Sequence, residues 1–323
     1  MRAIQVNETG GPEVLTWVEV DDPTPGPGQV VVETAAAGLN YIDTYHRRGI
    51  YPAELPFTPG LEHAGTVVAV GDGVDTLSVG DRVATANAMG SYAELVAADA
   101  DVLVPVPDGA DLDLAAAAML QGMTAHYLVE DTFPLAAGDR CLIHACAGGV
   151  GRLTIQMAVA LGAEVFTTVS TAEKAELAAG AGAHHVIRYD EVDFAEAVRE
   201  ISGEERPLDV VYDGVGATTF DAGLSLLRQR GLMCLFGAAS GQVPPIDLQV
   251  LSRGGSLYVT RPTLFHYIAS RHELEVRAGA VLGAVASGAL DVLIGERFPM
   301  ERAADAHRAL EGRRTQGKVV LIP

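Results

Sequence analysis

Short apolar runs separated by glycine and proline turns fill the chain as far as Asp111. Runs of this length, bounded by turn residues such as Gly80-Asp81, are typical of β-strands. The pattern predicts strands at 3–6, 16–19, 29–35, 65–70, 82–84 and 95–97. We therefore expect the first part of the chain to be an irregular, mostly β domain.

The pattern changes after Asp111. Residues 112–131 are rich in alanine and leucine and begin with acidic residues, which predicts a helix. Strands and helices then alternate: strands are predicted at 140–144, 164–169, 186–188, 209–212, 231–236 and 256–260, and helices at 150–161, 172–179, 194–201 and 218–227. This alternation favours a parallel, doubly wound sheet of the α/β class.

The pattern changes again near the C-terminus. It predicts helices at 271–287 and 302–311 and a last strand at 318–322. Although this strand lies far along the chain from the β-rich start, we expect it to pair back into the first domain.

Composition supports two folded domains. The chain has 323 residues, of which 49% are hydrophobic and 20% charged, so it can bury a large core. No apolar run approaches the length of a membrane span, and the N-terminal residues lack the apolar centre of a signal peptide. The three cysteines include no CxxC pair, which fits a reducing, cytoplasmic environment.

The chain is strongly acidic. Its formal net charge is −20, with 42 acidic and 22 basic residues, and such a surface repels nucleic acid and anionic membrane. Lys174 and Lys318 are the two lysines of the sequence, and the other basic residues are arginines. This bias fits either salt adaptation or a GC-rich genome, and we favour the second.

One glycine turn carries a chemical signal. The predicted strand 140–144 leads into Ala145, Gly148 and Gly151, and a predicted helix follows. In a dinucleotide-binding turn, Gly148 would let the backbone approach a pyrophosphate, and Gly151 would let the helix pack on the strand. Cys146 stands where the strict GxGxxG pattern has its first glycine. The position of the glycine turn between a strand and a helix still indicates a dinucleotide site.

The tip of the next strand indicates which dinucleotide binds. An NAD site usually has a carboxylate there, whereas this chain has Val169-Ser170-Thr171, with Lys174 shortly after. Hydroxyls and a cation suit a ribose 2′-phosphate, so we predict NADPH. Glu173 would oppose this prediction if its side chain turned inward.

Four motifs give the chain a family resemblance: residues 11–15, 38–43, 59–62 and 147–151. Together with IDTYHRRGIYP and RRTQGKVVLIP, they resemble the medium-chain dehydrogenase/reductase superfamily and, within it, the zinc-independent quinone oxidoreductase group that includes zeta-crystallin. The resemblance implies a GroES-like catalytic and substrate domain at 1–122 and 262–323, and a Rossmann NADPH-binding domain at 123–261.

The resemblance also implies chemistry without a metal. Zinc-dependent relatives have Cys where this chain has Asn40 and His where it has Leu61, and His63 alone does not make a zinc site. The hydride acceptor must then already be electrophilic, as quinones and α,β-unsaturated carbonyl compounds are.

The resemblance assigns roles to individual residues. The implied cofactor contacts are Thr124, Tyr127, Ala147, Gly148, Gly149, Val150, Ser170, Lys174, Tyr189, Phe236, Gly237 and Arg313. The implied catalytic group around the nicotinamide and the acceptor is Asn40, Asp43, Tyr45 and Tyr51. Simple packing remains the alternative for both tyrosines, and a structural hydrogen bond remains the alternative for Asp43.

The expected function is reduction of a quinone by NADPH. The alternatives are an NADPH-dependent alkenal or enone double-bond reductase and, outside enzymology, a zeta-crystallin-like structural or RNA-binding protein. The apolar strand from Ser256 to Thr260 ends the predicted sheet. An exposed edge there and the resemblance both predict a homodimer with a continuous sheet.

Overall fold

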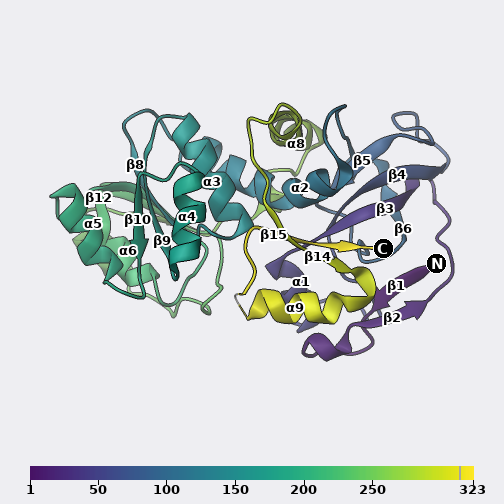
Figure 1. The fold of residues 1–323 in the computed structure, drawn as a ribbon, viewed down its shortest axis with the longest axis horizontal. Helices are drawn as coiled ribbons and strands as arrows, with labels where there is room; N and C mark the ends of the chain where they lie inside the picture. Colours follow the sequence, from purple (N-terminus) through teal and green to yellow (C-terminus); the bar gives the residue numbers. More distant parts are fainter. Residues whose placement is uncertain (313) are drawn as a thin grey trace. The chain divides into compact units, whose positions relative to one another are not determined.

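The computed structural model describes residues 1–312 and 314–323. The chain forms two compact units, residues 1–123 with 268–323, and residues 124–267 (Figure 1). The sequence predicts domain boundaries after residues 122 and 261, whereas the compact units are divided after residues 123 and 267. Residues 262–267 therefore belong to the second unit.

The first unit is built on a seven-stranded sheet. Its order is β14-β15-β3-β4-β5-β7, with β6 pairing with β3, and β1 and β2 form a separate pair. The strands are β1 (Arg2–Gln5), β2 (Thr16–Glu19), β3 (Gln29–Leu39), β4 (Glu62–Val70), β5 (Arg82–Thr85), β6 (Leu95–Asp99), β7 (Val104–Pro105), β14 (Ile294–Pro299) and β15 (Lys318–Ile322). The helices are α1 (Tyr41–Arg47), α8 (Arg271–Ala286) and α9 (Ala303–Glu311), and α2 (Leu112–Tyr127) runs on into the second unit.

The last strand returns to the first unit, as predicted. β15 is antiparallel to β3, with Val319 opposite Leu39 and Val320 opposite Gly38. In Figure 1 the yellow β15 accordingly lies beside the purple β3. Both strands are buried over most of their length because they contribute to one apolar core.

The second unit is a six-stranded parallel sheet in the order β10-β9-β8-β11-β12-β13. Its strands are β8 (Arg140–His144), β9 (Glu164–Val169), β10 (His185–Arg188), β11 (Leu208–Asp213), β12 (Leu227–Leu235) and β13 (Tyr258–Thr260). Its helices are α3 (Gly149–Ala160), α4 (Ala172–Gly180), α5 (Phe194–Ser202), α6 (Phe220–Leu226) and α7 (Gln249–Arg253). The predicted doubly wound sheet is confirmed, and its order reverses between β8 and β11, as in dinucleotide-binding folds.

Several boundaries differ from the predictions. α2 ends at Tyr127 and continues as a π-helical turn over Leu128–Thr132, so the predicted helix 112–131 changes its hydrogen-bonding pattern near its end. The predicted helix 218–227 is shorter, because Leu227 already pairs with Leu208 as the start of β12.

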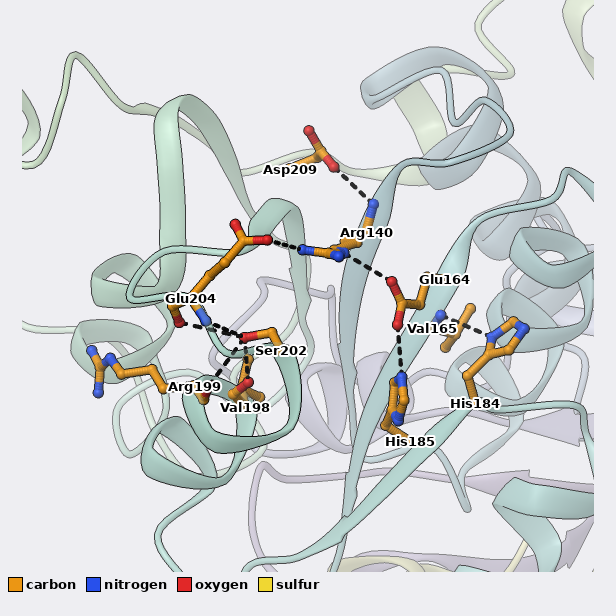
Figure 2. Close-up of polar contacts among 10 residues, drawn as sticks. All are labelled: Arg140, Glu164, Val165, His184, His185, Val198, Arg199, Ser202, Glu204 and Asp209. Atoms are coloured by element: carbon orange, nitrogen blue, oxygen red, sulfur yellow. Dashed lines mark hydrogen bonds and ion pairs between the residues drawn. The ribbon is translucent and has the colours of Figure 1, made fainter.

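A polar network joins the amino ends of the parallel strands (Figure 2). Arg140 donates to Glu164 and Glu204 at 2.8 Å each, and its backbone N–H donates to Asp209 at 2.7 Å. The second carboxylate oxygen of Glu164 lies 2.7 Å from His185. Arg140, Glu164 and His185 begin β8, β9 and β10, Asp209 is the second residue of β11, and Glu204 lies in the turn before it. The network thus links the amino ends of these strands, opposite the carboxyl ends where ligands bind in such sheets.

No helix among the described residues is long and apolar enough to cross a membrane.

Candidate functional site

The end of β3 and the start of α1 place two of the predicted catalytic residues together. Asn40 is the extended residue before α1, and its backbone N–H donates to Asp43 Oδ2 at 2.8 Å. The same oxygen accepts from the hydroxyl of Tyr92 at 2.9 Å. An asparagine followed three residues later by a carboxylate is a helix-start signal, and it could have predicted α1, which the strand pattern did not reveal.

Asp43 is fully buried, and its environment changes its acidity. Burial raises the pKa of its carboxyl group to about 7, while the hydrogen bonds from Asn40 and Tyr92 act in the opposite direction. Its other oxygen, Oδ1, has no hydrogen-bond partner among the described residues. The hydrogen bonds of Oδ2 match the structural role that was left open for Asp43.

The amide of Asn40 is held at both ends. Its Nδ2 donates to Glu62 Oε2 at 2.7 Å and its Oδ1 accepts from Lys318 Nζ at 2.8 Å. Lys318 also forms an ion pair with Glu62, and all three side chains are buried. Sequence reasoning assigned no role to Glu62 or Lys318. A lysine at the start of the otherwise apolar strand KVVLI was the available signal, because a buried lysine needs a partner.

Tyr45 and Tyr51 pack edge to face. Their ring centroids are 5.5 Å apart, and the Tyr51 ring also meets the ring of His46 at 5.8 Å. Tyr51 is 41% exposed, so one part of its ring packs and the other remains accessible. The arrangement holds Tyr51 in place, and it is compatible with both packing and acceptor binding.

In the second unit, the predicted glycine turn joins β8 to α3. Gly148 is the residue before α3, and Gly149 begins the helix. A Cβ on Gly151 would lie 2.7 Å from the Cα of Cys146, so only glycine fits at this crossing of helix and strand. The first N–H groups of α3 are therefore available where an anion would approach.

Cys146 takes the place of the first glycine without disturbing the turn. The left-handed conformation is adopted by the preceding residue, Ala145, with φ of +57°. The Cys146 thiol is buried, and burial raises its pKa to about 11. It is therefore a packing residue rather than a reactive thiolate.

Ser170 and Lys174 flank the start of α4. The side chain of Thr171 caps this helix by accepting from the backbone N–H of Lys174 at 3.2 Å. Lys174 lies in the first turn of α4, shortly after the end of β9, and Arg152 lies in the first turn of α3. Glu173 is exposed. A turn that requires glycine, a helix start and a nearby lysine together fit a phosphorylated dinucleotide.

The other predicted cofactor contacts of the second unit lie at the carboxyl ends of its strands. Tyr189 follows β10, donates its backbone N–H to Val169 at 3.0 Å, and is 49% exposed. Phe236 and Gly237 follow β12, and a Cβ on Gly237 would lie 2.4 Å from the carbonyl oxygen of Gly214. Such a close approach of two chain segments needs a glycine.

Thr124 and Tyr127 lie in the last turn of α2 and are both buried. The ring of Tyr127 stacks on Tyr267 with centroids 4.2 Å apart and an interplanar angle of 8°. Tyr267 also accepts a hydrogen bond from Thr132 at 3.1 Å. The predicted contact Arg313 lies outside the described residues.

No cluster of three or more His, Cys, Asp or Glu side chains suited to a metal ion occurs in residues 1–312 and 314–323. Leu61, at the position of a zinc-ligating histidine in zinc-dependent relatives, is buried and apolar.

Known proteins match this chain over its whole length. Family models described as alcohol dehydrogenase GroES-like domain and zinc-binding dehydrogenase match residues 26–108 and 149–275. A quinone oxidoreductase of Pseudomonas aeruginosa is 45% identical, over 100% of this chain and 99% of its own. A 2-haloacrylate reductase of a Burkholderia species is 44% identical, over 99% and 98%.

A solved structure agrees with these relatives. Escherichia coli quinone oxidoreductase, complexed with NADPH, superposes with a TM-score of 0.97 at 42% identity and covers 100% of both chains. The identity above 40% to these proteins along the full length, together with the match of both family models, establishes the family of this chain. The chain belongs to the zinc-independent quinone oxidoreductase family of the medium-chain dehydrogenases/reductases.

Proposed function

We propose that this protein reduces a quinone with NADPH. The observation that carries the proposal is the glycine turn between β8 and α3, together with the end of β9, which has no carboxylate and is followed by Lys174 in the first turn of α4. The relatives named quinone oxidoreductase support it, as does the NADPH in the E. coli structure. The second unit then binds the cofactor, and the first unit supplies Tyr45 and Tyr51 to the acceptor.

NADPH, when bound, would supply two reducing equivalents. Transferred as a hydride, with one proton taken up from water, they would convert the quinone into a hydroquinone, and transferred one electron at a time they would give semiquinones. The protein holds and orients the reactants, which can account for much of a rate enhancement. Tyr51, which is 41% exposed, would donate from its hydroxyl to a carbonyl oxygen as negative charge develops there. The amide of Asn40 is already engaged by Glu62 and Lys318, so we assign it to positioning.

Steady-state assays of the purified protein test the proposal. We expect oxidation of NADPH in the presence of 1,4-benzoquinone, with a kcat/KM at least about tenfold above that with NADH, as expected for one added charge-assisted contact. Equal use of NADH, or no turnover of any quinone, would contradict it. A Tyr51→Phe variant should lose activity without a change in NADPH affinity.

The 2-haloacrylate reductase relative favours a second candidate substrate class. A 2-haloacrylate carries a carbon–carbon double bond next to a carboxylate, so its reduction also requires hydride delivery to an electron-poor alkene. Parallel assays with 1,4-benzoquinone, 2-chloroacrylate and a 2-alkenal, at equal NADPH, rank the acceptors directly.

We also propose that the protein forms a homodimer through β13. This strand lies at the end of the sheet and pairs with β12, and Tyr258 and Val259 are 60% and 37% exposed. Two copies pairing antiparallel at this edge would continue the sheet and cover these side chains.

Light scattering tests the dimer. We expect a mass near twice 33.7 kDa. Val259→Lys should lower this mass because a lysine on an edge strand opposes pairing. Val68→Lys is a matched control, because this valine of β4 is similarly exposed, at 40%. A wild-type mass of one chain would refute the proposal.

A cytoplasmic location is the third proposal. Cys141, Cys146 and Cys234 are all free and buried, so the fold uses no disulfide among the described residues. Recovery of the native protein in the cytoplasmic fraction of its host would support this location, and recovery in an extracellular fraction would oppose it.

A further inference from the structure

Glu62 and Lys318 form a closed, buried polar cluster with Asn40, and neither of the two belongs to the catalytic group that the family resemblance assigns. Strand register explains why the three meet. Val319 pairs with Leu39 in antiparallel strands, so Lys318 faces Asn40, and Gly38 pairs with Glu62 on the next strand. The side chains of Asn40, Glu62 and Lys318 are 4%, 0% and 1% exposed, respectively.

The surrounding backbone is adapted to the Glu62 carboxylate. A Cβ on Gly38 would lie 2.1 Å from Glu62 Oε2, so a glycine is needed for the carboxylate to lie over β3. The other oxygen, Oε1, accepts the backbone N–H of Leu120 in α2 at 2.6 Å. One carboxylate is thus bonded to Lys318, to the residue before α1 and to the middle of α2.

Both helices carry residues predicted to lie near the nicotinamide or the acceptor. α1 follows Asn40 directly and contains Asp43 and Tyr45. In α2, Thr124 lies four residues after Leu120, about one helical turn. A shift of the start of α1 or of the middle of α2 would move these groups.

We propose that Lys318 and Glu62 are positioning residues, a buried ion pair that locks Asn40 and thereby fixes α1 and α2 for hydride transfer. The inference rests on the proposed function. A buried ion pair adds little net stability compared with an apolar pair of similar size, so orientation is a better reason for its presence.

A neutral double variant separates orientation from stability. Glu62→Gln/Lys318→Met removes both charges at nearly constant volume, so no unpaired charge remains buried. We expect kcat with NADPH and 1,4-benzoquinone to fall at least about tenfold, since small misplacements of reacting groups are costly. The KM for NADPH should change less than about threefold, because Lys174 is untouched. Amide hydrogen exchange of residues 40–47 should become faster.

Val67→Ala is the matched control. Val67 lies in β4, as Glu62 does, is fully buried, and belongs to a separate apolar cluster. Its truncation should lower the melting temperature while kcat and the exchange of residues 40–47 stay at wild-type values. If the double variant does not fold, Glu62→Asp is measured in the same way, because it keeps both charges and only shortens the carboxylate side chain by one methylene.

The activity and the hydrogen exchange of the double variant decide whether Lys318 and Glu62 position α1 and α2 or only stabilise the fold. A folded Glu62→Gln/Lys318→Met protein with wild-type kcat and wild-type exchange in α1 would overturn the inference and leave the cluster purely structural. If the wild-type protein does not reduce quinones, the proposed function fails, and hydrogen exchange of α1 still decides whether Lys318 and Glu62 fix this helix.

Discussion

Asp43 is the last member of a chain of buried, hydrogen-bonded side chains. Arg47 donates to His307 Nδ1 at 3.0 Å, so the ring carries its proton on Nε2, which faces the Tyr92 hydroxyl at 3.4 Å. Tyr92 in turn donates to Asp43. Burial lowers the pKa of His307 to about 3, so the ring is neutral at physiological pH and the chain keeps one direction.

The raised pKa of Asp43 predicts a pH-dependent stability. Between the unfolded value of 3.8 and the folded value of about 7, the folded state binds more protons, so this group lowers stability as pH rises through that window. Asp43→Asn removes this effect, and its unfolding free energy relative to wild type should rise from pH 5 to pH 8 by up to about 3 kcal/mol, since about two pH units of the window lie above pH 5. Buried His63 and His307 have lowered pKa values and act in the opposite direction, but they cancel in the difference. Chemical denaturation of both proteins at pH 5 and pH 8 measures this difference. The same difference in unfolding free energy at the two pH values would contradict the prediction.

Lys174 should set the preference between the two nicotinamide cofactors. Lys174→Met removes the cation predicted to pair with the 2′-phosphate, so the Kd for NADPH should rise roughly tenfold to a hundredfold, as for the loss of one charged hydrogen bond. The Kd for NADH should stay nearly constant. Glu173→Gln is the neighbouring control, since its exposed side chain should leave both affinities within about twofold. Fluorescence titration measures the Kd values for NADPH and NADH. If Lys174→Met weakened the binding of both cofactors equally, Lys174 would support the fold of the site and not recognise the 2′-phosphate.

Local residue signals predicted some of these groups but not their partners. Gly148, Gly151 and Lys174 lie within one β-α-β-α stretch, so spacing alone could connect them. Lys318 meets Asn40 across 278 positions, and its role depends on a strand register that no local pattern contains. The Tyr92–Asp43 bond likewise joins two segments through tertiary packing.

At the scale of elements, the glycine turn depends on one close contact. In Gly151→Ala, the new methyl group would meet the Cα of Cys146 at 2.7 Å and the carbonyl oxygen of Ala145 at 2.9 Å. We expect a loss of stability of about 1–3 kcal/mol from overpacking, together with weaker NADPH binding as α3 moves away. Gly283→Ala in α8 is the control, because its Cβ meets nothing within 4 Å and should stabilise by about 0.5–1 kcal/mol. Chemical denaturation measures the unfolding free energy of both variants. If Gly151→Ala changed it no more than Gly283→Ala does, the backbone around Gly151 would have moved to accommodate the methyl group, and the prediction would be wrong.

The predicted elements were most accurate where the local pattern was clear. The strands 140–144 and 164–169 match the structure residue for residue, because each is a short run rich in apolar and β-branched residues between turns. β14 was not predicted, since Gly295, Glu296 and Pro299 interrupt its apolar pattern and it is only partly buried at the sheet edge. α1 was missed because seven residues are too few for helical periodicity.

At the scale of the whole molecule, the charge of −20 opposes compaction and association with polyanions. It therefore argues against the RNA-binding alternative. In a gel-shift assay at low salt we expect no retarded RNA, and a retarded band that sodium chloride removes would contradict this expectation.

The same charge predicts that salt stabilises the fold. Self-repulsion between acidic side chains is screened as the Debye length falls from about 30 Å at 0.01 M salt to about 3 Å at 1 M. Each kcal/mol gained should raise the melting temperature by roughly 2–4 °C. Sodium chloride is the salt to use, because sulfate also strengthens apolar burial.

A charge-reduced variant separates screening from other effects of salt. Glu8, Glu54, Asp72 and Asp75 are exposed, and changing all four to their amides takes the net charge from −20 to −16. We expect this variant to melt higher than wild type at low salt and to gain less from added sodium chloride, because less repulsion remains to be screened. A wild-type melting temperature that falls with sodium chloride would mean that attractive pairs such as Arg140–Glu164 outweigh the excess of acidic charge.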